Sequence, residues 1–302
     1  MPHTNTLDLV PNQGWDERIL VCRNGRLVDT FIVVTTRYVV LVDTVINPAT
    51  ARQMVKYARP YFTDGRQLLV VNTHADYDHA WGNQLFVGPQ AETPAPLIAT
   101  RRCAEQFQEP DAAALLQQMQ TQEPSIFGEV RLAPPTVLFE ERLLLDGGDL
   151  TLLFFATPGH TPDHLSIYIP EIATLLAADG AEFPFPMART VDGLPIMRQS
   201  LATMAALEPQ QALYCHAPVT SGPQLLHDNM RYFDMLEARC RTALAQGVSA
   251  DPPVEADVAA LVDFPFDEAV RANGHADFLN AHHRTAWHPQ QIRMMLTYLA
   301  QQ

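Results

Sequence analysis

The stretch that decides the fold is Leu68-Leu69-Val70-Val71-Asn72-Thr73-His74-Ala75-Asp76-Tyr77-Asp78-His79, in which an apolar run passes directly into histidines and aspartates. A short apolar run bounded by polar residues predicts a buried strand, here residues 68–72. Neutral imidazoles and carboxylates suit divalent metals as ligands. The sequence therefore predicts a metal site at the end of a buried strand.

Further potential ligands stand in the same setting, at or just after the end of an apolar run. They are His160 after residues 150–156, Asp179 after residues 173–178, and His216 after residues 212–215. Side chains on strand-end loops converge at one rim of a sheet, where a rigid scaffold holds them against their mutual repulsion. Because crowded carboxylates raise one another's pKa unless a cation compensates them, we expect divalent metal at this rim.

The remaining sequence alternates strand-rich stretches with helices. Asn24-Gly25 and Asp146-Gly147-Gly148-Asp149 stand between apolar runs, so each predicts a β-hairpin; residues 137–145 are predicted as one strand. Helical spacing of apolar residues begins at Pro48 and at Pro289, which suits the first turn of a helix. This order predicts an α/β fold in which two sheets pack together with helices outside.

A boundary is predicted at Asp251-Pro252-Pro253, which separates a domain of residues 1–250 from a C-terminal helical extension of residues 251–302. The amphipathic final helix has three open interpretations. It packs on its own core, caps a pocket, or forms a homodimer contact.

The amino-acid composition argues against some classes of function. A formal net charge of −14 argues against a nucleic-acid partner, since such proteins rely on clustered Lys and Arg. The chain has no apolar run long enough for a membrane span, and its polar start lacks the features of a secretory signal, so a cytoplasmic location is expected. The four cysteines have no CxxC spacing and predict buried apolar residues rather than disulfides or a metal site.

Two segments resemble those of a known family. Residues 73–79 resemble the HxHxDH signature of the metallo-β-lactamase superfamily, and Thr157-Pro158-Gly159-His160-Thr161-Pro162-Asp163-His164 resembles its TPGHTxGH segment. Asp179 resembles the bridging carboxylate of that family, and His216 resembles its last ligand. The resemblance extends over residues from about 17 to about 245. It implies a four-layer αββα sandwich formed from two similar halves.

The resemblance also implies which residues bind metal. One ion would be held by His74, Asp76 and His160, the other by Asp78, His79 and His216, with Asp179 between them. Zinc is the expected metal, as one or two ions. His164 is expected to support the strand or to hydrogen-bond a ligand rather than to bind metal.

Three residues depart from the family pattern. Asp76 replaces a histidine, so a site containing it is richer in oxygen and favours Mn or Fe more than a three-histidine site would. If Asp76 does not reach the metal, a single-metal enzyme results. Asp163 replaces a glycine and is expected to add an acid near the rim. Cys215 stands where glycine is common and is predicted to be a packing residue.

The predicted activity is hydrolysis by a metal-bound hydroxide, with Asp78 both ligating metal and orienting the nucleophile. Phe183, Phe185 and Met187, in the loop after Asp179, are expected to line the entrance for a small-molecule substrate. An ester, a lactone or a thioester is the preferred bond. The acid at position 76 leaves two alternatives open, an iron-containing redox or oxygen-handling protein, and a metal-deficient binding protein that retains the fold.

Overall fold

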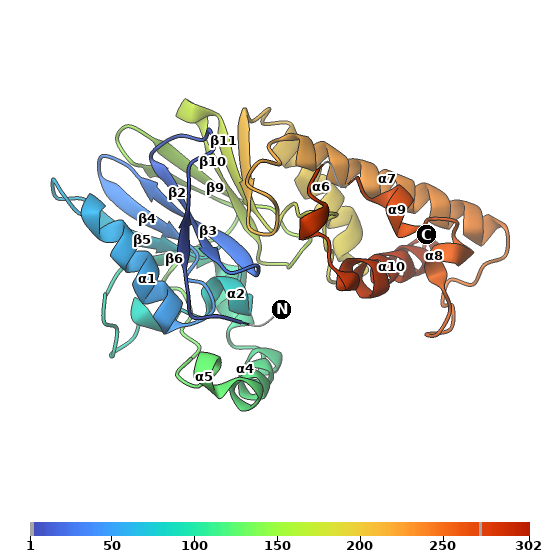
Figure 1. Ribbon diagram of the computed structural model, residues 1–302, viewed down its shortest axis with the longest axis horizontal. Coiled ribbons are helices and arrows are strands. Elements are labelled where there is room, and N and C mark those ends of the chain that lie inside the picture. Colours follow the sequence, from blue (N-terminus) through green and yellow to red (C-terminus); the bar gives the residue numbers. More distant parts are fainter. Residues whose placement is uncertain (1–2, 272–273) are drawn as a thin grey trace. The chain divides into compact units, whose positions relative to one another are not determined.

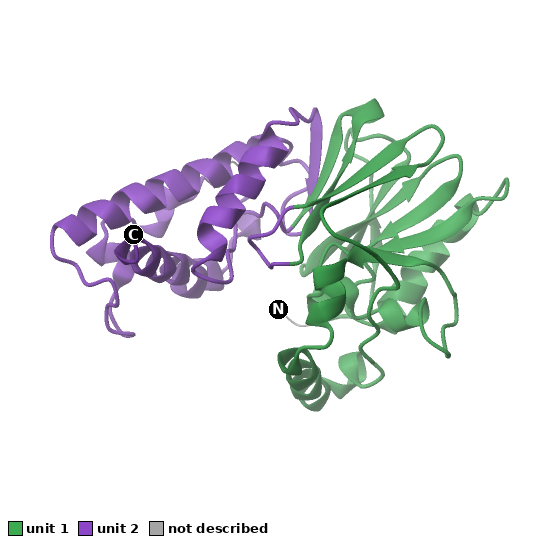
Figure 2. Ribbon diagram, turned by 180° about the vertical axis from the view of Figure 1, so that it is seen from behind, with its two compact units in different colours: residues 1–156, 163–178 green, residues 157–162, 179–302 purple. Residues whose placement is uncertain are grey.

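The computed structural model describes residues 3–271 and 274–302. The chain divides into two compact units, coloured separately in Figure 2. Unit 1 comprises Met1–Ala156 and Asp163–Ala178, and unit 2 comprises Thr157–Pro162 and Asp179–Gln302. This grouping differs from the predicted division at residue 250, because residues 251–302 belong to the same unit as residues 179–250.

The first sheet of unit 1 begins with antiparallel strands and ends with parallel ones. Its order is β1-β2-β3-β4-β5-β6-β7, antiparallel from β1 to β4 and parallel from β4 to β7 (Figure 1). The strands are β1 (Asp8–Val10), β2 (Ile19–Asn24), β3 (Val28–Val34), β4 (Tyr38–Val42), β5 (Gln67–Val71), β6 (Leu97–Thr100) and β7 (Val137–Phe139). The predicted hairpin at Asn24-Gly25 joins β2 to β3, with Gly25 at a φ of +57°.

The second sheet of unit 1 contains four antiparallel strands among the described residues. These are β8 (Arg142–Asp146), β9 (Thr151–Ala156), β10 (Leu165–Ile169) and β11 (Thr174–Ala178). The predicted hairpin of residues 146–149 joins β8 to β9, and Asp146 pairs with Thr151. Residues 137–145 were predicted as one strand, which is wrong. The chain leaves the first sheet at the exposed Glu140 and Glu141 and enters the second at Arg142.

Helices connect several strands of unit 1. They are α1 (Pro48–Ala58), η1 (Arg59–Tyr61), α2 (Tyr77–Ala80), η2 (Asn83–Leu85), α3 (Arg101–Gln106), α4 (Pro110–Gln122), α5 (Pro124–Phe127) and η3 (Pro170–Ile172). The predicted helix at Pro48 is confirmed, and Asn47 caps it by accepting the Thr50 N–H at 2.9 Å.

Unit 2 is mostly helical. It contains β12 (Gln211–Tyr214), α6 (Gly193–Ala205), α7 (Gln224–Ala245), α8 (Val258–Leu261), α9 (Phe266–Ala269), η4 (Ala276–Phe278), η5 (His283–Trp287) and α10 (His288–Ala300). Phe185 stacks on Tyr232 with ring centroids 4.6 Å apart, in a core that includes His288. In the sequence, the polar setting of His275, His282, His283 and His288 favours solvated side chains. For His283 and His288 this prediction is wrong, because both side chains are buried in the structure.

The predicted mixed α/β fold with two sheets and C-terminal helices is thus confirmed. Cys22, Cys103, Cys215 and Cys240 are all buried and free of disulfides, as expected. Within residues 3–271 and 274–302, no helix is both long enough and apolar enough to cross a membrane.

Candidate metal centre

The segment after β5 brings four of the predicted ligands together within unit 1. His74 and His79 are fully buried, with their ring centroids 4.1 Å apart. The Nε2 atom of His74 lies 3.4 Å from Asp76 Oδ2, and the Nε2 atom of His79 lies 3.9 Å from Asp78 Oδ2. Each imidazole therefore turns the same ring nitrogen toward a carboxylate.

Asp43, directly after β4, determines the tautomer of His79. Its Oδ2 atom lies 2.9 Å from His79 Nδ1, and both residues are buried. A carboxylate only accepts, so the proton of neutral His79 resides on Nδ1 and the lone pair on Nε2. Asp43 also adopts a φ of +66°, which is uncommon for a residue with a side chain. The backbone at the end of β4 thus takes an unfavourable conformation that brings this carboxylate to the histidine.

Thr73 extends the same arrangement to His74. Its backbone N–H donates to Asp43 Oδ1 at 2.7 Å, and its hydroxyl donates to Asp43 Oδ2 at 2.8 Å. Since that hydroxyl proton is used, the Thr73 oxygen accepts from His74 Nδ1 at 3.0 Å. His74 therefore also carries its lone pair on Nε2, the form in which an imidazole coordinates a metal.

Unit 2 brings the other three predicted ligands together around one oxygen atom. Asp179 follows β11 and is buried, and its Oδ2 atom lies 3.5 Å from His160 Nε2 and 3.2 Å from His216 Nε2. His160 lies on the turn of residues 157–162, and His216 comes shortly after β12. A single carboxylate oxygen between two imidazole nitrogens suits a ligand that is shared.

The loop after Asp179 determines the tautomer of His160. His160 Nδ1 donates to the Met187 carbonyl at 2.9 Å, and Arg189 donates to Nε2 at 3.3 Å, so the lone pair is on Nε2. Glu182 Oε1 lies 3.2 Å from the same Nδ1 and accepts the Met187 N–H at 3.2 Å. Asn229 of α7 holds Glu182 in place by accepting its backbone N–H and donating to its carbonyl, each at 2.9 Å.

Arg189 and Arg198, two arginines that follow Asp179 in the sequence, have different surroundings. Arg198 pairs with Asp234 at 2.6 Å and with Glu237, so it serves the packing of α6 on α7. Arg189 is exposed as a whole, but its guanidinium contacts His160. Arg189 therefore places its cationic group beside a predicted ligand, His160, whereas Arg198 does not.

Two residues of the 157–164 segment are placed in unit 1. Asp163 was expected to add an acid near the rim. Its carboxylate is 2% exposed, and its Oδ2 atom accepts the N–H of Ala75, the residue between His74 and Asp76, at 2.8 Å. His164 is fully buried, with its ring centroid 5.2 Å from that of His74.

The three residues predicted to line the entrance are mostly buried in unit 2. Phe185 is 1% exposed in the aromatic core, and Phe183 packs edge-on against His275 and Phe278. Met187 is half-buried and contributes its carbonyl to His160. Their contact with substrate stays a prediction.

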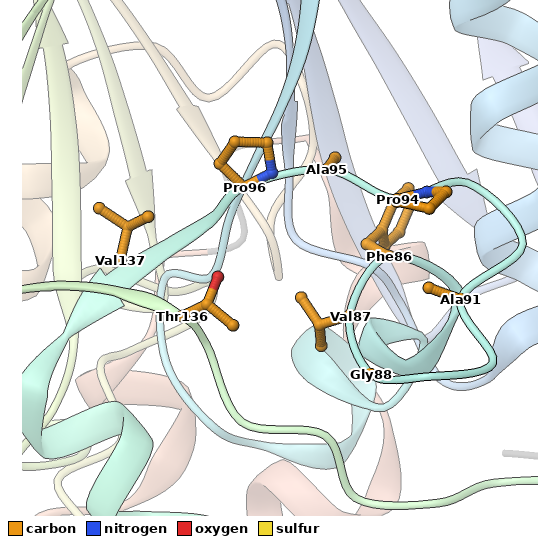
Figure 3. Close-up of a pocket in the computed structure, with 9 residues that line it drawn as sticks. All are labelled: Phe86, Val87, Gly88, Ala91, Pro94, Ala95, Pro96, Thr136 and Val137. Carbon is orange, nitrogen blue, oxygen red and sulfur yellow. The ribbon is translucent and has the colours of Figure 1, made fainter.

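An open groove of about 570 Å³ lies elsewhere in unit 1. Residues of the 86–96 loop line it together with Thr136 and Val137, and these side chains are mainly apolar (Figure 3). None of the predicted ligands is among these lining residues. The groove is therefore separate from the metal chemistry.

Sequence reasoning missed Asp43, Glu182 and Asn229 as residues that position ligands. Asp43 carried a usable signal, because it follows an apolar strand as the predicted ligands do. Glu182 was considered only as part of a loop at the entrance. Asn229 is one polar residue on the buried face of a long helix, and no pattern in the sequence relates it to residue 182.

The donor set in each unit fits a divalent metal. Buried imidazoles with lone pairs on Nε2 stand beside carboxylates, and hydrogen bonds on Nδ1 hold the rings of His74, His79 and His160 in orientation. Buried carboxylates such as those of Asp78 and Asp179 cost free energy unless a nearby cation compensates their charge.

Comparison with known families gives an independent result. Residues 23–192, more than half of the chain, match the sequence model of the metallo-beta-lactamase superfamily.

Similar curated proteins share one name, hydroxyacylglutathione hydrolase. The one from Maricaulis maris is 28% identical over 212 residues, which cover 67% of this chain and 70% of that protein. The one from Hahella chejuensis is 27% identical over 218 residues, which cover 70% of this chain and 72% of that protein. A shorter match to the Rhodopseudomonas palustris protein is 37% identical over 86 residues, covering 28% of this chain and spanning a third of that protein's length (33%).

Solved structures share the fold at low sequence identity. A metallo-beta-lactamase family protein from Thermus thermophilus has a TM-score of 0.58 at 18% identity, covering 98% of this chain and 93% of its own. A sec-alkylsulfatase from Pseudomonas sp. has a TM-score of 0.62 at 16% identity, covering 94% of this chain and 49% of its own. Similarities at this level concern the fold alone.

Proposed function

The chain belongs to the metallo-beta-lactamase superfamily and is a metallo-hydrolase, and from that premise we propose that it cleaves the acyl thioester bond of a small molecule. The names of the similar curated proteins support a thioester, because an acyl group on glutathione is carried by its sulfur. The observation that carries the proposal is the set of histidine tautomers. Nδ1 of His74, His79 and His160 is engaged by an acceptor, so that Nε2 serves as the donor atom to metal.

We propose seven side chains as metal ligands, four from unit 1 and three from unit 2. They are His74, Asp76, Asp78, His79, His160, Asp179 and His216. With Asp76 among them the donor set is rich in oxygen, which admits Mn or Fe beside Zn. The number of ions, one or two, depends on whether Asp76 coordinates.

A divalent metal held by these residues would supply Lewis acidity toward the thioester carbonyl and would make water acidic enough to attack near pH 7. The residues of the chain orient the attacking water, accept its proton and hold the histidine rings in place. Asp78, which is 7% exposed, is proposed to orient the attacking water and to accept its proton. Asp43 and the Met187 carbonyl keep His79 and His160 in the tautomer that presents Nε2. Arg189 is proposed to meet an anionic group of the substrate.

The test combines metal analysis with a substrate panel. Metal content per chain is measured by mass spectrometry for the purified protein, then again after chelation and after adding back Zn, Mn or Fe. Each preparation is assayed on an S-acyl glutathione, an oxygen ester, a lactone, a phosphodiester and a β-lactam. We expect bound metal, loss of activity on chelation, and the highest kcat/KM on the thioester.

Variants assign the activity to the proposed ligands. His79→Ala and Asp179→Asn are expected to lose metal and to lower kcat/KM at least about 100-fold, while the exposed His227→Ala serves as the matched control and retains both. A protein that binds no metal, and that gains no activity when Zn, Mn or Fe is added, would contradict the proposal. Iron with visible absorption and no hydrolysis would support the redox alternative instead.

A further inference from the structure

Asp163 has a place in unit 1 that the proposed chemistry does not explain. Its carboxylate is buried at 2% exposure, and its Oδ2 atom accepts the backbone N–H of Ala75 at 2.8 Å. Ala75 is the single residue between two proposed ligands, His74 and Asp76. We propose that Asp163 is a positioning residue, which fixes the backbone at Ala75 so that the short side chain of Asp76 reaches the metal. This inference rests on the proposed function.

The geometry of Asp76 explains why its backbone needs support. An aspartate has one methylene between its Cα atom and its carboxylate, so a displaced backbone cannot be compensated by a change of rotamer. Asp76 is in extended conformation before α2, with a φ of −60° and a ψ of 152°. Its side chain is 20% exposed, whereas that of His74 is fully buried, so packing restrains Asp76 less than its neighbour.

The segment is held on both sides of His74. On one side, Asp43 binds the Thr73 N–H, and the Thr73 carbonyl accepts the Leu165 N–H at 2.9 Å. On the other side, the Ala75 N–H donates to Asp163, and the Asp76 carbonyl accepts the N–H groups of His79 and Ala80 at 3.0 and 2.9 Å. The bond from Ala75 joins this stretch to a segment 88 positions away in the sequence, so its loss is expected to loosen the backbone between His74 and Asp76.

Asp163 is itself anchored on the first sheet. The Thr100 hydroxyl, at the end of β6, donates to the Asp163 carbonyl at 2.9 Å and accepts the Cys103 N–H at 3.1 Å. Burial, and next the negative charge of Asp163, raises the pKa of the Cys103 thiol well above its usual range. The thiol therefore stays protonated beside the carboxylate. Asp163 thus connects the backbone between two proposed ligands to the junction of β6 and α3 by hydrogen bonds.

A double-mutant cycle on metal affinity tests this role. Asp163→Ala is made in the natural sequence and in an Asp76→Ala background, and the Kd for Zn and for Mn is measured by competition with a chelator. In the natural background we expect Asp163→Ala to weaken binding about 10- to 100-fold, as lost supporting hydrogen bonds do. In the Asp76→Ala background the same change is expected to alter Kd by no more than about twofold, the limit for independent sites.

Conservative and control variants complete the design. Asp163→Asn keeps an acceptor for the Ala75 N–H, so it is expected to restore most of the affinity that Asp163→Ala loses. Asp29→Ala removes another buried carboxylate of unit 1, one that pairs with Arg23, and it is expected to leave the Kd unchanged. If Asp163→Ala does not fold, the cycle is run with Asp163→Ser, whose hydroxyl is too short to reach Ala75.

Equal losses of affinity in both backgrounds, or no loss in either, would overturn the positioning role. An Asp163→Asn variant that binds metal as weakly as Asp163→Ala would also overturn it. The loss of affinity would then come from the charge of Asp163 and not from its hydrogen bond to Ala75. If the natural protein binds neither metal, the proposed function fails. If it binds metal and the cycle is additive, the inference about Asp163 fails alone.

Discussion

At the scale of single residues, the candidate site depends on hydrogen bonds that fix which ring nitrogen of each histidine carries the proton. Asp43 binds three donors, the Thr73 N–H, the Thr73 hydroxyl and His79 Nδ1. The carboxylate is fully buried, so its charge acts in a medium of low polarity. One aspartate that is not itself a proposed ligand therefore orients His74 and His79, the two proposed histidine ligands of unit 1.

Asp43→Asn tests this control of the tautomer. If the amide N–H of asparagine faces His79 Nδ1, it favours the tautomer with its proton on Nε2, which cannot bind metal. We expect the affinity for Zn to fall about 10- to 100-fold, measured by competition with a chelator. Asp149→Asn, which disturbs a carboxylate bound to Arg18 and to the Thr36 backbone, is the control. An unchanged Zn affinity in Asp43→Asn would refute the assigned role.

At the scale of elements, the turn that carries His160 is packed tightly against α6. Gly159 has a φ of +136°, and a Cβ atom on it would lie 2.4 Å from the Met197 Cα atom. The Ser200 hydroxyl of α6 also donates to the Pro158 carbonyl at 2.6 Å. Glycine is required here both for its backbone conformation and for the close approach of the helix.

Gly159→Ala separates these two requirements when it is compared with Gly14→Ala. Gly14 has a similar φ of +115°, but open space surrounds its Cβ position, so its substitution introduces backbone strain without a clash. We expect Gly159→Ala to lower the free energy of unfolding by about 1–3 kcal/mol more than Gly14→Ala does, measured by urea denaturation. Equal losses in the two variants would mean that the clash is relieved by local movement.

At the scale of the whole molecule, unit 2 contains histidines in its core that fold in the neutral form. His288 donates from Nε2 to the Phe264 carbonyl at 2.8 Å and accepts from the Tyr232 hydroxyl at Nδ1. Burial lowers the pKa of His288 below its usual value and, helped by nearby His282, lowers that of His283 to about 4. Protonation of either residue therefore opposes folding.

The sign of the resulting pH dependence follows from these shifts. Because the pKa of folded His283, about 4, lies below the usual 6.5, the unfolded chain binds more protons between these values. The contribution of His283 to stability is complete above about pH 6.5 and is lost as the pH falls toward 4. We therefore expect the free energy of unfolding to be lower at pH 5 than at pH 7 in urea denaturation.

His283→Asn isolates this contribution, because its side-chain oxygen can still accept the Asn280 N–H that His283 Nδ1 accepts at 3.1 Å. The difference in unfolding free energy between pH 7 and pH 5 is expected to shrink in this variant. Substitution of the exposed His227 with Gln is expected to leave that difference unchanged. A pH dependence that His283→Asn does not alter would assign the loss of stability to other groups.

Much of the fold could be predicted from local signals. The turns at Asn24-Gly25 and at residues 146–149 join the expected strands, since glycine and aspartate favour tight turns wherever they stand between apolar runs. The switch from β7 to β8 was missed, because two short strands in different sheets give the same apolar pattern as one long strand. The burial of His283 and His288 was missed for a related reason, since polar residues surround them in the sequence.

The sequence by itself determined the superfamily, the strand-end positions of the proposed ligands and the departure at Asp76, because these follow from residue types and short spacings. Only the tertiary structure decided which groups orient those ligands. His79 depends on Asp43, 36 positions away, Glu182 depends on Asn229, 47 positions away, and Ala75 depends on Asp163, 88 positions away. The physical reason is that a hydrogen bond requires two atoms about 3 Å apart, and only the packed chain brings such distant residues together.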